Sequence, residues 1–171
     1  LTIHADRSDM LCIMAASGDV VAFSPCPMVA GFIVDEDPRQ QREWVEMINH
    51  DFNAPTEADV FLCLLDSGVN HQHPLLERII QPKDCLAAVD EWGTDDNKKH
   101  GTLMAGNVIY GDLSDYIAGR NFHGCNYRLC SVKLLSPSLD GDDILWGEYA
   151  QQAVAKIEIQ RYDKRLLFCS A

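Results

Sequence analysis

Two short segments constrain the fold of this chain most strongly, because each attaches a polar residue of catalytic type to an element of regular structure. In the first, an apolar run of strand length, residues 61–65, leads directly into Asp66 and then into a Ser-Gly turn. Open parallel sheets form their ligand sites at the carboxyl ends of the strands, which is where Asp66 would lie. The second segment, residues 100–106, begins with His100 and has the pattern of a helix.

Strand-like and helix-like segments alternate through the rest of the chain. Such alternation is typical of a mostly parallel sheet covered by helices, and it predicts an α/β fold. We expect strands at residues 60–65, 128–135 and 166–169, and helices at about residues 102–110 and 143–162.

The first part of the chain has a different pattern. Apolar residues at 10–16 and 20–23 flank a Ser-Gly-Asp turn, which predicts a β-hairpin. A helix is then expected to begin with Asp37 as its N-cap and Pro38 at its first position. We expect this helix to end near residues 53–55.

The composition limits the partners of the chain. Of its 171 residues, 47% are hydrophobic, which is enough for a folded core. The net charge of -12 argues against nucleic acid, whose phosphates would be repelled, and against anionic membrane surfaces. No apolar stretch approaches the roughly 20 residues that span a bilayer, and the first residues do not form a signal-peptide pattern. We therefore expect neither a nucleic-acid partner nor a membrane partner.

The cysteine pattern indicates a reducing compartment. The cysteines are seven in number, an odd count, and several lie in apolar runs. The nearest pair, Cys125 and Cys130, lacks the C-x-x-C spacing of zinc or redox sites. We expect no cysteine metal site and a cytoplasmic location. The seven are Cys12, Cys26, Cys63, Cys85, Cys125, Cys130 and Cys169.

Asp66 and His100 have the residue types of a general-base pair. A carboxylate can fix the tautomer and orientation of a histidine that removes a proton from a nucleophile, and imidazole titrates near neutral pH. Small residues at Gly101, Ala105 and Gly106 would let the helix of His100 pack closely against the sheet. Taken separately, Asp66 could cap a turn and His100 could be a solvated helix start. Their occurrence together favours the catalytic interpretation.

Two other groups could bind metal ions. His71 and His73 alternate on an extended segment, but no third ligand has suitable spacing, and a polar loop held extended by Pro74 is the simpler interpretation. Asp95 and Asp96 could offer carboxylate oxygens to calcium, although solvated loop charges explain them as well. We expect no metal ligands and no cofactor, with calcium as the open alternative.

Both polar segments have the form of known motifs. Leu65-Asp66-Ser67-Gly68-Val69 resembles the aspartate motif of the subtilases, the subtilisin-like serine proteases. His100-Gly101-Thr102-Leu103-Met104-Ala105-Gly106 resembles their histidine motif, and the order of aspartate before histidine is the order of that family. Residues 130–135 resemble the strand that follows, and residues 167–170 resemble the start of the strand that lines the substrate cleft. The resemblance runs from Val60 to Ala171, about two thirds of the chain.

The resemblance implies a three-layer, mostly parallel subtilisin-like fold and a serine endopeptidase that acts on polypeptides. Asp66 would orient His100, His100 would activate a serine, and Ser170 would lie in the substrate cleft. No serine of the chain lies in the Gly-Thr-Ser-type motif of the family, so the nucleophile is expected beyond Ala171. The serines are Ser8, Ser17, Ser24, Ser67, Ser114, Ser131, Ser136, Ser138 and Ser170.

A sequence with the aspartate and histidine motifs alone has two interpretations. It is the N-terminal part of an active peptidase, truncated and inactive by itself, or it belongs to a protease-like scaffold that acts in binding or regulation. Retention of both Asp66 and His100 favours the first. A truncated sheet would expose a strand edge and apolar faces, so we expect the isolated chain to self-associate.

The domain organisation follows from the same resemblance. Residues 57–171 correspond to the N-terminal part of the peptidase domain, and residues 1–56 form an N-terminal extension made of the hairpin and the helix. The extension is compatible with a prosegment, which many subtilases carry. We favour an integral layer of the domain, because the connection at residues 55–59 is too short for a flexible cleavable linker.

Overall fold

The computed structural model describes residues 36–111, 113, 116, 124–135 and 146–170, together with Cys12 and Ala16. The chain divides into two units, Leu1–Asp35 and Glu36–Ala171. The predicted hairpin at residues 10–23 lies outside the described residues except at Cys12 and Ala16. Both of these are helical, so the strand prediction is wrong at these two positions.

The second unit contains a four-stranded sheet in which every pairing is parallel. Its strand order is β2-β3-β1-β4, so the first strand lies inside the sheet. The α/β prediction is confirmed, and three of the strands fall where the sequence places them. The fourth, β2, has only three residues and was missed. The strands are β1 (Val60–Asp66), β2 (Cys85–Ala87), β3 (Arg128–Lys133) and β4 (Arg165–Ser170).

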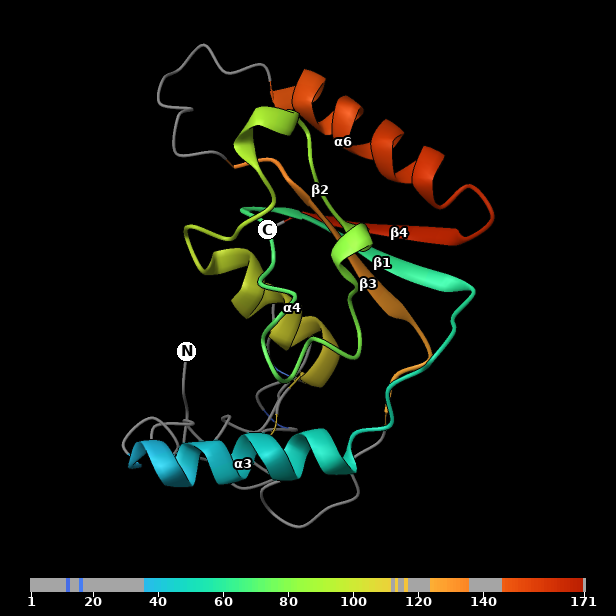
Figure 1. Ribbon diagram of the computed structural model, residues 1–171. Helices are drawn as coiled ribbons and strands as arrows, with labels where there is room; N and C mark the ends of the chain where they lie inside the picture. Colours follow the sequence, from blue (N-terminus) through green and yellow to red (C-terminus); the bar gives the residue numbers. More distant parts are fainter. Residues whose placement is uncertain are drawn as a thin grey trace. The chain divides into compact units, whose positions relative to one another are not determined.

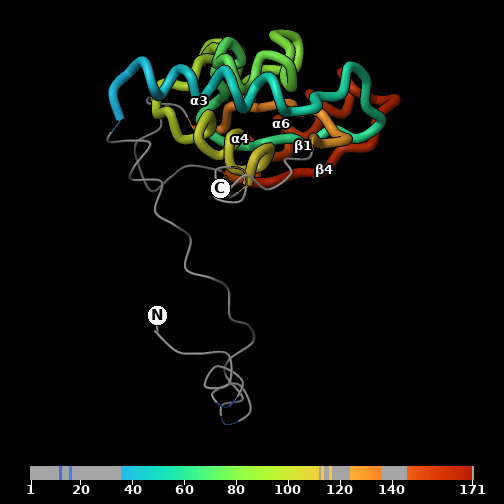
Figure 2. The backbone as a smooth tube through the Cα atoms, turned by 90° about the horizontal axis from the view of Figure 1, so that it is seen from below, coloured from blue at the N-terminus to red at the C-terminus, as the bar shows by residue number. Residues whose placement is uncertain are grey.

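Helices cover both faces of this sheet, as Figure 1 shows: α6 lies on one face, and α4 and α3 lie on the other. Figure 2 views the unit from the side of α3, with β1 and β4 next to each other. Within the described residues of this unit, the long helices are α3 (Pro38–Asp51), α4 (His100–Tyr110) and α6 (Trp146–Gln160), and the 3-10 helices are η1 (Pro82–Asp84) and η2 (Asp90–Trp92). None of the helices in the described ranges is long and apolar enough to span a bilayer.

The helix predicted to begin at Asp37 is confirmed. The side chain of Asp37 accepts hydrogen bonds from the backbone N–H groups of Arg39, at 2.7 Å, and Gln40, at 3.2 Å. Pro38 occupies the first turn, where its missing N–H costs nothing. This helix, α3, belongs to the same unit as the sheet.

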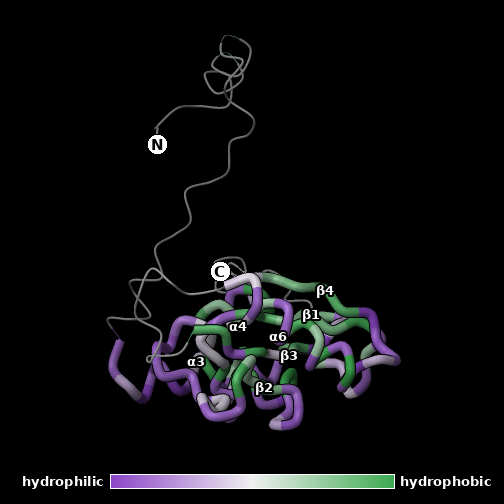
Figure 3. Tube along the Cα trace, turned by 90° about the horizontal axis from the view of Figure 1, so that it is seen from above, coloured by the Kyte–Doolittle hydropathy of each residue, from purple (hydrophilic) through white to green (hydrophobic). Residues whose placement is uncertain are grey.

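Successive side chains of β1 point to opposite faces of the sheet. Phe61, Cys63 and Leu65 join the core beneath α6, and Leu64 joins the core beneath α3 and α4. Asp66 has the parity of Leu64, so its carboxylate is directed to the side of α4. Figure 3 shows the hydrophobic character of β1 and β4 along the chain trace.

The helix α4 approaches the turn after β1 very closely at one glycine. A Cβ atom on Gly101 would lie 2.0 Å from the carbonyl oxygen of Gly68, and Ala105, one turn further, is completely buried. The prediction that small residues allow this contact is correct for Gly101 and Ala105. It is wrong for Gly106, where an added Cβ would have no neighbour within 4 Å.

Alanine substitutions at the two glycines of α4 should therefore act in opposite directions. Gly101→Ala forces a clash with backbone and should destabilise the fold by about 2–3 kcal/mol. Gly106→Ala removes a flexible residue from a helix and should stabilise it by about 0.5–1 kcal/mol. Urea unfolding of both variants measures the difference, and equal stabilities would contradict the close contact.

The strand β4 forms an edge of the sheet. It pairs with β1 only, among the described residues, and its side chains Leu167 and Phe168 are 52% and 40% exposed. A parallel edge with unpaired backbone groups and exposed apolar side chains is a template for association.

The isolated chain should therefore self-associate through this edge. Sedimentation velocity should show a concentration-dependent increase in mass, and Leu167→Lys should reduce it by placing a charge on the strand. Tyr162→Lys is the matched control, because Tyr162 is 87% exposed but lies in the turn before β4. A monomer at all concentrations, or equal effects of the two variants, would contradict the prediction.

Candidate active site

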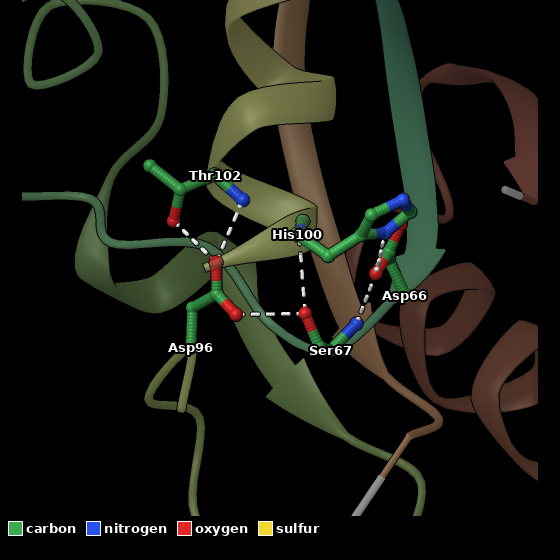
Figure 4. A network of polar contacts seen from close by, with 6 residues as sticks. Asp66, Ser67, Asp96, His100 and Thr102 are labelled. Carbon is green, nitrogen blue, oxygen red and sulfur yellow. Dashed lines mark hydrogen bonds and ion pairs between the residues drawn. The ribbon is translucent and has the colours of Figure 1, made fainter. Parts of the chain in front are cut away.

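The structure brings His100 and Asp66 together at the carboxyl edge of the sheet, as the sequence predicts. The Nδ1 atom of His100 lies 2.9 Å from both carboxylate oxygens of Asp66 (Figure 4). The Asp66 side chain is 1% exposed, whereas the His100 side chain is 49% exposed. The carboxylate is therefore buried, and the imidazole lies between it and the solvent.

This geometry determines the tautomer of His100. An ionised carboxylate only accepts hydrogen bonds, so Nδ1 carries a proton, and in the neutral imidazole Nε2 is the nitrogen with the lone pair. Among the described residues, Nε2 has no hydrogen-bond partner. The backbone N–H of Ser67 donates to Asp66 at 2.6 Å and fixes the carboxylate in turn. The arrangement is that of an oriented general base with its reactive nitrogen open.

The first turn of α4 is capped from outside the helix. Its N-cap residue, Lys99, has φ 61° and supplies no side-chain cap. The N–H of Gly101 instead donates to the Ser67 hydroxyl at 3.0 Å, and the N–H of Thr102 donates to Asp96 at 2.8 Å. Free N–H groups at a helix start need such acceptors. The turn of the aspartate motif thus ties down the helix that carries His100.

Asp96 is the centre of this capping network (Figure 4). It accepts hydrogen bonds from the Ser67 hydroxyl at 2.7 Å and from the Thr102 hydroxyl at 2.6 Å, besides the Thr102 N–H. Partial burial raises the pKa of Asp96, but these hydrogen bonds outweigh it, so the pKa lies below its ordinary value. A carboxylate held ionised near a helix N-terminus also complements the helix dipole.

Lys133 supports the loop that carries Asp96. Its side chain, at the end of β3, is completely buried, and Nζ donates to the carbonyl of Asp95 at 2.6 Å. The same loop crosses over Gly68, which has φ 100°, so that a Cβ there would lie 2.6 Å from the carbonyl of Thr94. Only glycine adopts this backbone without strain and leaves room for the loop.

Sequence reasoning missed the positioning roles of Ser67, Asp96, Thr102 and Lys133. Asp96 was assigned to a calcium site or to solvated loop charge, whereas its carboxylate caps α4. An acceptor side chain shortly before the first turn of a helix is a capping signal, and this signal could have identified Asp96. No sequence signal identified the role of Lys133, because a lysine in an apolar run does not show which carbonyl groups its side chain will contact.

Ser170 lies at the end of β4, opposite Leu65 in the register, and is exposed. Its substrate-binding role stays a prediction. Among the three described serines, Ser67 is engaged by Asp96 and Gly101, and Ser131 is buried with an unpaired hydroxyl. None of the three forms a hydrogen bond with His100.

The other candidate ligands have local roles or none. The Nδ1 atom of His73 accepts a hydrogen bond from the backbone N–H of Leu75 at 3.3 Å. Within the described ranges, no group of three His, Cys, Asp or Glu side chains is arranged to hold a metal ion. Burial raises the pKa of the Cys85 thiol to about 12 and raises that of Cys125, which disfavours thiolate nucleophiles there.

The parallel sheet defines an α/β protein, and a buried carboxylate and an imidazole lie in contact at the carboxyl ends of its strands. The sequence model of the subtilase family matches residues 57–168, and by this match the chain belongs to the subtilase family. Family membership indicates a protease. No match is found among curated proteins or among solved structures.

Asp96→Asn should destabilise the chain by about 1 kcal/mol near pH 7, because the capping acceptor loses its charge. The pKa of Asp96 is lower in the folded chain than its unfolded value of 3.8, so its contribution is present above that value and is lost as pH falls through the lowered pKa. Urea unfolding at several pH values should therefore show the two proteins converging in acid.

Asp95→Asn is the matched control for that experiment, since Asp95 is the exposed neighbour of Asp96. It should change stability little at any pH. A constant difference between Asp96→Asn and the unsubstituted chain from pH 7 down to strongly acidic solution would contradict an ionised capping carboxylate.

Proposed function

We propose that this chain supplies the aspartate and histidine of a serine endopeptidase, with the serine carried by a further segment of the protein. The observation that supports the proposal most directly is the Nδ1 contact of His100 with a buried Asp66 carboxylate, which leaves Nε2 open. The subtilase match over residues 57–168 supports the same assignment.

The reaction follows from the roles of the two side chains. Nε2 of His100 takes the proton of the serine hydroxyl as the serine oxygen bonds to the peptide carbonyl carbon. The same proton passes to the leaving amine when the C–N bond breaks, which leaves an acyl-enzyme. Water then bonds to the acyl carbon as it gives a proton to Nε2 of His100. The C–O bond to the serine breaks, the serine oxygen takes that proton back, and the acid is released. Asp66 remains ionised and stabilises the imidazolium in both steps.

The proposed substrate is a polypeptide, and the cleft would lie beside the exposed end of β4 where Ser170 is located. By this proposal the 171-residue chain alone does not hydrolyse peptides, because the proposed nucleophile belongs to a further segment of the protein. The six described cysteines are free, which supports a reducing, cytoplasmic location.

A second candidate is a protease-like scaffold without a nucleophile, acting in binding or regulation. An oriented histidine with an open Nε2 has no evident use in such a scaffold, so the first candidate is preferred. The two differ in one chemical property, the presence of a serine that His100 activates.

A fluorophosphonate probe on the longer protein should label one serine outside the present sequence. His100→Ala should abolish labelling and lower kcat/KM by about 10⁴-fold or more, and Asp66→Asn should lower it by about 10⁴-fold because the wrong tautomer is favoured. Asp90→Asn, at an 89% exposed side chain on η2, is the control and should leave both unchanged.

Peptide mapping identifies the labelled residue. Absence of labelling in a well-folded longer protein would favour the binding scaffold, and unchanged turnover in His100→Ala would refute the catalytic assignment.

A further inference from the structure

A polar cavity lies at the amino ends of the strands, opposite the carboxyl ends where Asp66 is located. It has a volume of about 340 Å³ and is bordered by the starts of β1 and β3 and by the turn that joins α6 to β4. In Figure 1 these strand starts lie on the right, and α4 lies on the left. The length of β1 separates the two sites by about 20 Å, at about 3.3 Å per residue.

Basic side chains dominate the lining of this cavity. Four of its lining residues are cationic, namely Lys83, Arg128, Arg161 and Lys164, and one, Glu57, is acidic. This grouping is unusual in a chain of net charge -12 with 14 Lys and Arg residues in all. Solvated charges on an acidic protein are expected to intersperse their signs, so a concentration of cations around one hollow requires an explanation.

Arg128 is the strongest element of the cavity. The residue is only 6% exposed, and its Nη1 donates to the carbonyls of Pro55, at 3.1 Å, and Thr56, at 3.2 Å. These two bonds hold the guanidinium in a fixed orientation. Its Nε and Nη2 groups have no hydrogen-bond partner among the described residues. A largely buried guanidinium that lines a polar cavity and keeps unbonded N–H groups is suited to binding an oxyanion.

Arg161 forms the second wall. Its guanidinium carbon lies 4.7 Å from the ring centre of Phe61, and its Nε donates to the buried Asp84 at 2.7 Å. Nη2 contacts the same carboxylate oxygen, so the charge of Arg161 is largely compensated. Its Nη1 has no partner in the described ranges. Stacking and pairing fix the plane of this group, and Nη1 adds further donors to the cavity.

The two lysines differ in how far their charge is compensated. Lys164 lies 3.5 Å from Asp59 and 3.8 Å from Asp163, which are loose contacts. Lys83 forms no side-chain bond within the described part of the chain. The charge of Arg161 is compensated by Asp84. The positive charges of Lys83 and Arg128 exceed the negative charge of Glu57, so the cavity keeps a net positive charge.

We infer that this cavity is a binding site for a phosphate-type oxyanion, separate from the Asp66–His100 site and independent of the proposed protease function. Planar donors from Arg128 and Arg161 suit the oxygens of such an anion, and the lysines add charge. The volume lies at the lower end of the about 300–1,000 Å³ range of small-molecule sites, which leaves room for an organic group attached to the phosphate.

The test is a titration of the 171-residue chain in phosphate-free buffer, followed by amide and arginine side-chain NMR signals. Inorganic phosphate and phenyl phosphate are the two probes, with succinate at equal ionic strength as the carboxylate control. Saturable shifts at Arg128, Arg161 and residues 56–61 are expected with the phosphates and not with succinate. Tighter binding of phenyl phosphate supports an organic phosphate, and equal or tighter binding of inorganic phosphate supports the free ion.

Lys83→Gln should weaken phosphate binding about five- to tenfold, since a charge-assisted contact is lost. Lys83 is exposed, so the variant is expected to fold, and its circular dichroism spectrum verifies this. Lys98→Gln, which removes the same charge from an exposed loop near α4, should leave the affinity unchanged. The proposal would be overturned if both variants weakened phosphate binding equally, or if succinate shifted the same NMR signals. It would also be overturned if the shifts did not saturate up to about 10 mM phosphate.

Discussion

The capping of α4 by the turn that follows β1 is the interaction on which the site depends. The helix starts at a residue with left-handed backbone that offers no cap of its own, so its N–H groups require acceptors from elsewhere. Ser67 and Asp96 provide them, and the contact between Gly101 and Gly68 fixes the distance. The position of the imidazole beside Asp66 is therefore a consequence of helix capping as much as of the two catalytic-type residues.

The sheet polarity separates two kinds of chemistry in the same unit. At the carboxyl ends of the strands, a buried carboxylate and a half-exposed imidazole form an oriented base. At the amino ends, arginine and lysine side chains surround a polar cavity. Parallel strands place all their equivalent ends on one edge, so residues distant in sequence, such as Asp66 and Lys133, become neighbours there.

Much of the fold could be predicted because its signals are local. The apolar run before Asp66 predicts β1, and the Asp37-Pro38 pair predicts the start of α3. The three-residue strand β2 could not be found, since its pairing with β3 rather than its own pattern defines it. For the same reason the packing role that Gly101 and Ala105 have was also assigned to Gly106: all three are small residues on α4, and only their neighbours differ.

The sequence by itself determined the positions of three of the four strands, the alternation of strands and helices that is typical of a parallel sheet, and the two residues, Asp66 and His100, that lie together at the ends of the strands. These follow from side-chain pattern and from motifs in which each residue type has a local purpose. Tertiary structure alone decided the capping network and the basic cavity. Ser67 contacts Gly101 across 34 positions of sequence, Arg161 contacts Asp84 across 77, and Arg128 is held by the carbonyls of Pro55 and Thr56 across 73 and 72. Such contacts depend on where the strands place their ends, which no local pattern records.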